Sequence, residues 1–197
     1  LEGRWDYAIW DLAELKQIMH KWQTGLEGLG WNALYMENHD QPRSVSRFGD
    51  PVHYHEESSK MLATFFMLMQ GTPFIYQGQE IGMTNVEFAE LSDYRDVEIY
   101  NYYRERLLDG KDVSETMRRI AYRARDNART PMQWDDTLYG GFSTVVPWIR
   151  CNPNYHEINV EQQLTDPDSI LNYYKALIRL RKSSEALIYG TYEAVLQ

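Results

Sequence analysis

Cysteine is almost absent from this sequence, in which Cys151 is the only one among 197 residues. A single cysteine excludes an intrachain disulfide and a zinc site built on cysteines. It suits a reducing compartment, so we expect a cytoplasmic location. Long hydrophobic runs are missing too. The longest one, at residues 61–69, is far shorter than the roughly 18 residues of a membrane span, so we expect no membrane partner.

Clustered positive charge is also lacking. The formal net charge is −9, and no long run of lysine and arginine occurs. Binding to the phosphates of a nucleic acid depends on such clusters, so we expect no nucleic-acid partner. Apolar material is plentiful, because 43% of the residues are hydrophobic and 14% are aromatic. A chain of this length and composition can build the core of one domain or slightly more. Aromatic rings can also stack on sugars, but composition alone favours their use in the core.

The first half of the sequence repeats a helix followed by a strand. Apolar spacing predicts helices over residues 11–23 and 57–70, with Asp11 as the N-cap of the first helix. Short apolar runs predict strands at 33–36 and 74–76, and each strand leads into a polar loop. This βα repeat of about 40 residues is typical of a parallel sheet or barrel.

The second half is less regular. We expect a tyrosine-rich helix at 97–108 and another helix that starts after Asp112 and ends before Asn127. Residues 130–165 are rich in proline, glycine and asparagine, which predicts turns.

The C-terminal stretch is expected to hold one more helix and then strands. The run Thr165-Asp166-Pro167-Asp168 predicts a helix start, because a proline and acidic side chains suit the first turn. This helix would cover residues 168–182. Strands are expected around Gly190, within 187–196.

The most informative stretch is Glu37-Asn38-His39-Asp40-Gln41-Pro42-Arg43, which follows the first predicted strand. The proline pushes the residue before it toward an extended geometry and stops a helix from starting there. Polar residues at the carboxyl end of a buried strand are where α/β proteins bind ligands and carry out chemistry. A histidine beside an aspartate, with an arginine three residues on, can hold a polyhydroxylated ligand and stabilise positive charge. The alternative is that Asp40 caps its own loop backbone.

Five segments carry a resemblance to a known family. They are residues 38–43, 71–78, 80–85, 125–134 and 152–155. In these segments the chain resembles the α-amylase superfamily of glycoside hydrolases (glycoside hydrolase family 13), and most of all its oligo-1,6-glucosidase and α-glucosidase branch. Each segment alone is a weak signal. Together they run over most of the chain in family order and are specific.

The resemblance implies a fold. Family members consist of a (β/α)8 barrel followed by a β-sandwich domain. The chain is then an α/β protein in which residues 1–184 are the C-terminal part of the barrel, with 33–36 as the seventh strand and 74–76 as the eighth. Residues 185–197 would begin the β domain with its first strand. Two parallel strands leave bare edges, so we expect the back end of a larger barrel whose true N-terminus is missing.

The resemblance also implies an activity. Family members hydrolyse α-glucosidic bonds with retention, which needs a nucleophile and a general acid about 5 Å apart. By the family pattern these follow strands four and five, which are not in this chain. Asp40 matches the third carboxylate, which binds the non-reducing glucose and stabilises its cationic transition state. The chain is therefore expected to be an inactive fragment of a retaining, exo-acting α-glucosidase for short α-glucosides such as isomalto-oligosaccharides.

Four other residues are expected to have roles in the site or its scaffold. His39 can donate a hydrogen bond to a sugar hydroxyl in either tautomer, or it is a satisfied core histidine. Arg125 resembles the arginine that blocks longer chains and makes these enzymes exo-acting; otherwise it is a surface helix arginine. Glu98 aligns with an acidic residue near the leaving-group sugar, or it belongs to a solvated face. Arg43 is expected to pair with a loop carboxylate as a scaffold residue.

Other functions remain open. His53 and His55 alternate as metal ligands do on a strand, but they enter a helix, where they diverge, so we expect no metal and no other cofactor. Close relatives with the same motifs isomerise sucrose or hydrolyse phosphorylated trehalose. A different class is a non-catalytic, barrel-derived binding or assembly module. If the chain folds by itself, we expect it to associate with itself or with a complementary barrel fragment through its strand edges.

Overall fold

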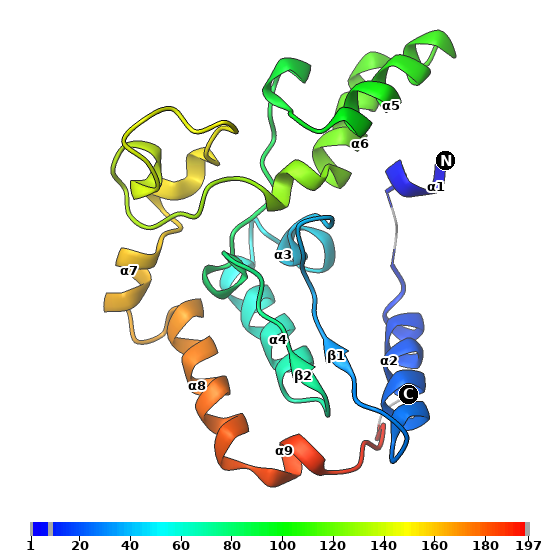
Figure 1. Cartoon of the computed structure of the whole chain (residues 1–197), viewed down its shortest axis with the longest axis vertical. Helices are drawn as coiled ribbons and strands as arrows, with labels where there is room; N and C mark the ends of the chain where they lie inside the picture. Colours follow the sequence, from blue (N-terminus) through cyan, green and yellow to red (C-terminus); the bar gives the residue numbers. More distant parts are fainter. Residues whose placement is uncertain (1, 8–9, 196–197) are drawn as a thin grey trace.

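The computed structural model describes residues 2–7 and 10–195. At its centre two short strands, β1 (Ala33–Leu34) and β2 (Thr72–Pro73), run parallel, with their first residues opposite each other (Figure 1). The backbone N–H of Phe74 extends the ladder by bonding to the carbonyl of the last residue of β1 (2.8 Å). The parallel pairing that the βα repeat predicts is therefore confirmed.

Both strands are shorter than the sequence predicts. β1 stops at residue 34 instead of 36, and β2 lies at 72–73 instead of 74–76. After Phe74 the chain leaves the ladder, because the backbone N–H of Tyr76 bonds to the side chain of Gln79 (3.2 Å). Apolar composition predicts an extended backbone, but a paired strand also needs a neighbour, and in the described part of the chain each strand has one on a single side only.

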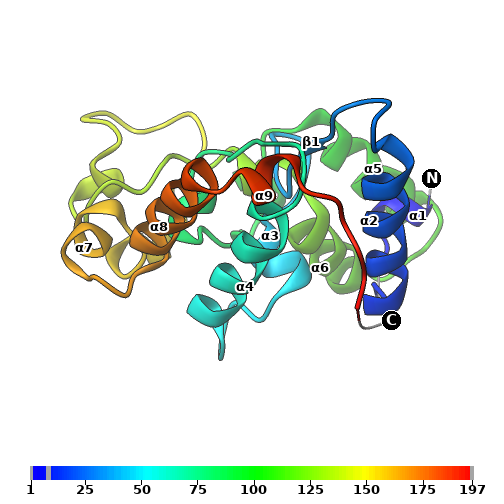
Figure 2. The ribbon, with the colours of Figure 1, turned by 90° about the horizontal axis from the view of Figure 1, so that it is seen from below.

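Three helices surround the strand pair. They are α2 (Leu12–Leu26) before β1, α4 (His55–Met67) between the strands, and α8 (Ile170–Ser183) near the end of the chain. Figures 1 and 2 show α2 and α8 on opposite sides of the strands. Burial of apolar side chains between β1, α4 and α8 forms one core, which contains Leu34, Ala63, Phe66, Met67, Met69, Ile170, Tyr174 and Leu177.

Helix boundaries agree with the sequence where a local cap sets them. Asp11 caps α2 by accepting a hydrogen bond from the amide three residues on (2.9 Å). α5 (Val97–Leu108) has the bounds that the sequence predicts, and Asp112 caps α6 (Val113–Arg123) as expected. α4 starts at residue 55 instead of 57 and ends at 67 instead of 70.

A second core lies above the carboxyl ends of the strands in Figure 1. It is formed by α1 (Glu2–Trp5), α5, α6, the segment before α5 and the turn at Ile149. The rings of Trp5 and Tyr102 stack there at 4.5 Å. Its buried residues are Trp5, Val86, Phe88, Tyr94, Ile99, Tyr102, Ile120, Ala124 and Ile149.

Short helical segments account for much of the remaining chain. They are α3 (Ser44–Phe48), η1 (Gln79–Ile81), η2 (Leu91–Asp93), η3 (Arg125–Ala128), η4 (Leu138–Gly141), η5 (Pro153–His156), α7 (Val160–Thr165) and α9 (Glu185–Tyr189), where η marks a single 3-10 turn or two. Within the described residues, no helix is both long and apolar enough to cross a membrane.

The helix predicted at residues 168–182 is confirmed as α8, but its start was predicted too early, at 165–168. This run begins at the last residue of α7, whose N-cap Asn159 accepts a hydrogen bond from the amide of Gln162 (2.9 Å). α8 begins later, at Ile170, with Ser169 as its N-cap. The sequence signal marked the turn between the two helices, because the proline and aspartates suit a turn as well as a first helical turn.

The strands predicted within 187–196 are also wrong. Residues 185–189 form α9, and residues 190–195 contain no strand, while 196 and 197 lie outside the described residues. The carbonyl of Leu187 accepts a hydrogen bond from the side chain of Arg181 (3.1 Å), which draws this segment onto α8. The amide of Gly190 bonds within the same turn, to Ala186 (2.9 Å). The domain boundary at residue 184 stays a prediction.

Candidate functional site

Asp40 lies in the loop that follows β1. The side chain of Asn38 accepts a hydrogen bond from the Asp40 N–H (2.8 Å), and its carbonyl accepts one from the amide of Gln41 (3.2 Å). This Asx turn bends the chain as it leaves the strand. Asn38 therefore supplies the backbone cap. The Asp40 side chain is 45% exposed and is available to other side chains.

Three basic side chains approach the Asp40 carboxylate. Its Oδ1 lies 3.0 Å from Nη2 of Arg129 and 3.4 Å from Nη1 of Arg125. Its Oδ2 lies 3.3 Å from Nε2 of His39. The two arginines stand four residues apart across η3, which brings both guanidinium groups to the same carboxylate. The His39 side chain is 71% exposed, unlike a core histidine.

Arg125 is held by two acidic side chains at the start of α5. Asp96, whose side chain is only 3% exposed, accepts hydrogen bonds from Nε (2.5 Å) and Nη2 (2.8 Å) of Arg125. Glu98 lies 3.0 Å from the same Nη2, and its other oxygen pairs with Arg4 of α1 (2.6 Å). The bidentate pair fixes the plane of the guanidinium, so Arg125 is not a freely moving surface arginine.

Asp96 and Arg125 stabilise each other's charged forms. Burial by itself would raise the pKa of Asp96, but the hydrogen bonds and charge of Arg125 outweigh it, and the pKa is lowered. The hydrogen bond to Asp96 in turn raises the pKa of Arg125. The pair therefore stays ionised through the neutral range and gives the site a fixed electrostatic frame.

A buried carboxylate ties η3 to the entry of α5. Asp126 is fully buried and accepts hydrogen bonds from the backbone amides of Arg95 (2.7 Å) and Asp96 (3.1 Å). The carboxylate uses the free N–H groups that precede a helix. Asp126 thereby holds the turn that carries Arg125 against the segment that carries Asp96.

Sequence analysis did not single out Arg129, Asp96 or Asp126 as site residues. Arg129 and Asp126 lie in the segment 125–134 that carries the family resemblance, and Asp96 directly precedes the predicted helix at 97–108. The available signal was the charge density of these two short stretches. Nothing in their local pattern says that the two stretches meet.

The scaffold role predicted for Arg43 is confirmed. Its guanidinium is fully buried, and Nη1 lies 3.2 Å from Oε2 of Glu37 in the same loop. Oε1 of Glu37 accepts hydrogen bonds from the amide and the hydroxyl of Ser44, both at 2.7 Å. Arg43 therefore points into the molecule and not toward a ligand.

A cavity of about 340 Å³ opens beside Asp40. It is lined by Arg4, Asp40, Gln41, Pro42, Arg123 and Arg125. Guanidinium, carboxylate and amide groups face one small space there, so it offers both donors and acceptors. Such a lining suits a ligand rich in hydroxyl groups.

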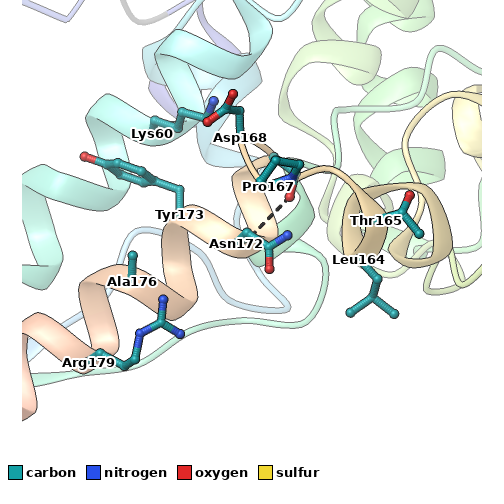
Figure 3. Close-up of a pocket in the computed structure, with 10 residues that line it drawn as sticks. Lys60, Leu164, Thr165, Pro167, Asp168, Asn172, Tyr173, Ala176 and Arg179 are labelled. Carbon is teal, nitrogen blue, oxygen red and sulfur yellow. Dashed lines mark hydrogen bonds between the residues drawn. The ribbon is translucent and has the colours of Figure 1, made fainter.

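Two other hollows are lined mainly by other residues, although the second shares Gln41 with the cavity beside Asp40. Figure 3 shows a basin of about 640 Å³ between α4 and the start of α8, lined by Lys60, Leu164, Thr165, Pro167, Asp168, Ser169, Asn172, Tyr173, Ala176 and Arg179. Two of its polar side chains have protein partners: Lys60 pairs with Glu56 (3.1 Å), and the hydroxyl of Tyr173 lies 2.7 Å from that of Thr64. A groove of about 700 Å³ runs between α2 and β1.

The two histidines at the start of α4 have separate partners. His53 Nδ1 lies 3.3 Å from Asp50, whereas His55 Nε2 lies 2.6 Å from the carbonyl of Gly82. In the part of the chain that the structure describes, no group of three or more histidine, cysteine, aspartate or glutamate side chains is arranged to hold a metal ion.

Sequence comparison finds one family model that matches nearly the whole chain. Residues 2–190 match the family described as "Alpha amylase, catalytic domain". The oligo-1,6-glucosidase of Parageobacillus thermoglucosidasius is 59% identical over 196 residues, which is 99% of this chain and 35% of that protein. The trehalose-6-phosphate hydrolase of Bacillus subtilis (strain 168) is 47% identical, over 98% of this chain and 34% of that protein. The chain thus spans about a third of the length of these relatives.

Solved structures of similar proteins superpose closely on the chain. The crystal structure of Bacillus licheniformis trehalose-6-phosphate hydrolase gives a TM-score of 0.96 at 48% identity, over 98% of this chain and 35% of that one. The isomaltulose synthase from Klebsiella sp. LX3 gives 0.93 at 42% identity, over 98% of this chain and 35% of that one.

Proposed function

Because this chain belongs to the α-amylase catalytic domain family, we propose that it supplies the Asp40 side of the active site of a retaining, exo-acting α-glucosidase. The substrates would be short α-glucosides such as isomalto-oligosaccharides, in line with the name of the 59% identical relative. The observation that carries the proposal is the Asp40 carboxylate, half exposed at the end of a parallel strand and flanked by Arg125, Arg129 and His39.

Asp40 would act on the glucosyl unit whose bond is broken. Its Oδ1 is engaged by two arginines, whereas Oδ2 faces only the exposed His39, so Oδ2 is the oxygen free to accept a sugar hydroxyl. An anion beside a developing oxocarbenium ion stabilises it, by several kcal/mol in a site closed to water. His39 would donate to a neighbouring hydroxyl.

Arg125 and Glu98 would define where the sugar chain ends. Arg125 is fixed by Asp96 and cannot swing aside, so it blocks the passage of a longer chain and makes cleavage exo-acting. Glu98 is 40% exposed at the edge of the same cluster and would meet the leaving-group sugar. Both roles require only that the ion pairs seen here persist when the sugar binds.

The remaining chemistry would come from outside these 197 residues. Retention needs two carboxyl groups about 5 Å apart across the scissile bond. The two carboxylates that share Arg125 with Asp40, Asp96 and Glu98, are each engaged by that arginine. We therefore place the nucleophile and the general acid in the two thirds of the relatives' length that the chain does not cover. In this scheme β1 and β2 are the seventh and eighth barrel strands, residues 185–197 begin the β domain, and the protein works in a cytoplasmic, reducing setting.

A chimera tests the proposal. The chain would replace the matching third of the Parageobacillus thermoglucosidasius oligo-1,6-glucosidase, and hydrolysis of isomaltose would be measured. We expect activity, and we expect Asp40→Asn to lower kcat by roughly a hundredfold or more. Asp109→Asn, which removes the same charge at the exposed end of α5, should leave kcat unchanged. A folded chimera that is inactive would favour a non-catalytic binding or assembly module. An active chimera that Asp40→Asn does not affect would contradict the role of Asp40.

Hydrolysis of a phosphorylated disaccharide is the second candidate. It is favoured by the TM-score of 0.96 to the Bacillus licheniformis trehalose-6-phosphate hydrolase. The sequence favours the first candidate, because the chain is 47% identical to the Bacillus subtilis trehalose-6-phosphate hydrolase and 59% identical to the oligo-1,6-glucosidase. A second chimera in the trehalose-6-phosphate hydrolase separates the two. We expect the chain to restore a larger fraction of the parent kcat/KM in the oligo-1,6-glucosidase.

A further inference from the structure

The buried Arg43 joins three segments that meet beneath the Asp40 cluster. Besides its pairing with Glu37, its Nη1 donates to the carbonyl of Gln77 (2.7 Å), just after β2. Its Nε donates to the carbonyl of Asn127 (3.1 Å), inside η3. Its backbone N–H donates to the side chain of Asn85 (2.9 Å). The loop after β1, the loop after β2 and η3 are thus connected through one side chain.

Tyr76 also contacts η3, at the residue after the one that Arg43 binds. Its ring lies 5.5 Å from the guanidinium of Arg43, and its hydroxyl donates to the carbonyl of Ala128 (2.9 Å). The carbonyls of residues 127 and 128 are therefore taken in succession by Arg43 and Tyr76. Residues 127 and 128 lie between Arg125 and Arg129, whose guanidinium groups both reach Asp40.

We propose that Arg43 and Tyr76 are positioning residues, which set how closely Arg125 and Arg129 approach Asp40. The role in sugar binding rests on the function proposed above, whereas the effect on the cluster rests on these contacts alone. Glu37 balances the charge of Arg43 at 3.2 Å, so Arg43 acts by holding η3 in place and not by adding charge near Asp40.

Two reporters for this role are built into the cluster. The Nε–H of Arg125 donates to Asp96 (2.5 Å), and the Nε–H of Arg129 donates to the carbonyl of His39 (3.0 Å). Each gives its own signal in a 1H–15N spectrum of the full chain. If η3 shifts, both hydrogen bonds lengthen, so both signals move and their hydrogen exchange becomes faster.

Tyr76→Phe and Arg43→Lys test the proposal. Tyr76→Phe removes one hydroxyl and keeps the ring, and it should speed the exchange of the Arg125 and Arg129 Nε–H groups about fivefold, the effect of losing one ordinary hydrogen bond. Tyr173→Phe is its matched control, because it also removes a hydrogen-bonded tyrosine hydroxyl, which lies 2.7 Å from that of Thr64 between α8 and α4 and away from the Asp40 cluster. Arg43→Lys should act in the same direction and more strongly.

Arg181→Lys is the control for Arg43→Lys, because Arg181 is also buried and bonds to backbone carbonyls, but under the end of α4. It should lower global stability and leave both Nε–H signals in place. The proposal is overturned if Tyr76→Phe leaves the two signals as in the wild type, or if the controls move them equally. Should Arg43→Lys fail to fold, the tyrosine pair still decides.

Affinity for the glucose-like cation 1-deoxynojirimycin connects the Arg43 and Tyr76 contacts to sugar binding. It would be measured by calorimetry on the oligo-1,6-glucosidase chimera described above, as the wild type and with the same substitutions. We expect Tyr76→Phe to weaken this affinity, again about fivefold, and Tyr173→Phe to leave it unchanged. Absence of binding to the wild type would count against the proposed function, while the exchange measurement would still decide the role of Arg43 and Tyr76.

Discussion

Asp96 and Arg125 are joined by two parallel hydrogen bonds, from Nε to Oδ2 at 2.5 Å and from Nη2 to Oδ1 at 2.8 Å. The residues are 29 positions apart, and their pairing fixes the arginine that reaches Asp40. This pair makes the cluster sensitive to acid.

We expect Asp96→Asn to remove a stabilisation that depends on pH. The folded-state pKa of Asp96 lies below its ordinary value of 3.8, so its contribution is complete above that value and is lost as the pH falls through the folded pKa. The variant should be about 1.5–3 kcal/mol less stable than the wild type at pH 7, and the gap should narrow below pH 4, about the ordinary carboxyl pKa. Denaturant unfolding at both pH values measures this, with Asp109→Asn as the control. An equal difference in unfolding free energy between wild type and Asp96→Asn at both pH values would contradict this prediction.

We expect Glu80→Gln to stabilise the chain at neutral pH. Burial raises the pKa of Glu80, and Oε2 is buried with no hydrogen-bond partner. A carboxyl group with a raised pKa favours the folded state most below its ordinary value of 4.5, and this favourable effect is lost as the pH rises through the folded pKa. Glutamine stays neutral, so the variant should gain stability at pH 7 and gain nothing near pH 4, roughly the unfolded pKa. Thermal unfolding at both pH values checks this, and the exposed Glu90→Gln should show no such difference.

Arg181 is expected to be essential for stability. It donates to the carbonyls of Met67 (2.8 Å), Met69 (2.6 Å), Gly71 (2.5 Å) and Leu187 (3.1 Å), which joins α8 to the end of α4, the approach to β2 and α9. A lysine ammonium cannot span the same set, and the carbonyls left without a partner should cost about 2–4 kcal/mol. Equilibrium unfolding in urea measures the loss.

The control for this variant is Arg179→Lys, at an exposed position on the same helix. It should change the unfolding free energy by less than about 0.5 kcal/mol. Equal losses in the two variants would contradict a specific role for the carbonyl contacts of Arg181.

We expect the chain to self-associate. The apolar side chains of Tyr35, Phe74 and Ile75 are 55%, 56% and 38% exposed beside the strand pair, and each strand is paired on one side only in the described residues. Open strand edges next to apolar surface favour pairing with another chain. Multi-angle light scattering should find dimers or larger species, and Phe74→Lys should reduce them more than Leu108→Lys on α5. A monodisperse monomer across the micromolar range would contradict this.

The 197-residue chain alone is expected not to hydrolyse 4-nitrophenyl α-glucoside. In the proposed role Asp40 stabilises a glucosyl cation, but bond cleavage with retention also needs a nucleophile and an acid about 5 Å apart. A sensitive assay should therefore give the same rate for the wild type and Asp40→Asn, both at the buffer background. Turnover that disappears in Asp40→Asn would mean that the chain carries the full catalytic set.

Local features of the structure could be predicted from the sequence where one or two neighbouring residues decide them. Asp112 starts α6, and the bounds of α5 agree with those predicted, because a cap and an apolar period act within a single turn or two. The same reasoning failed at 187–196, where apolar residues predicted strands. A strand requires a partner, and in the structure the carbonyl of Leu187 bonds to Arg181 on α8.

By itself, the sequence determined which residues belong to the cluster's two ends: Asp40 in its loop after a strand, and Arg125 in a segment of family-like residues. Only the tertiary structure decided that Arg129 binds Asp40, 89 residues away, together with Arg125, and that Asp96 orients Arg125. The physical reason is the range of the forces involved. Caps and periodicity act between neighbours in the chain, whereas an ion pair depends on where the packing of β1, β2 and α5 brings distant charges out of water together.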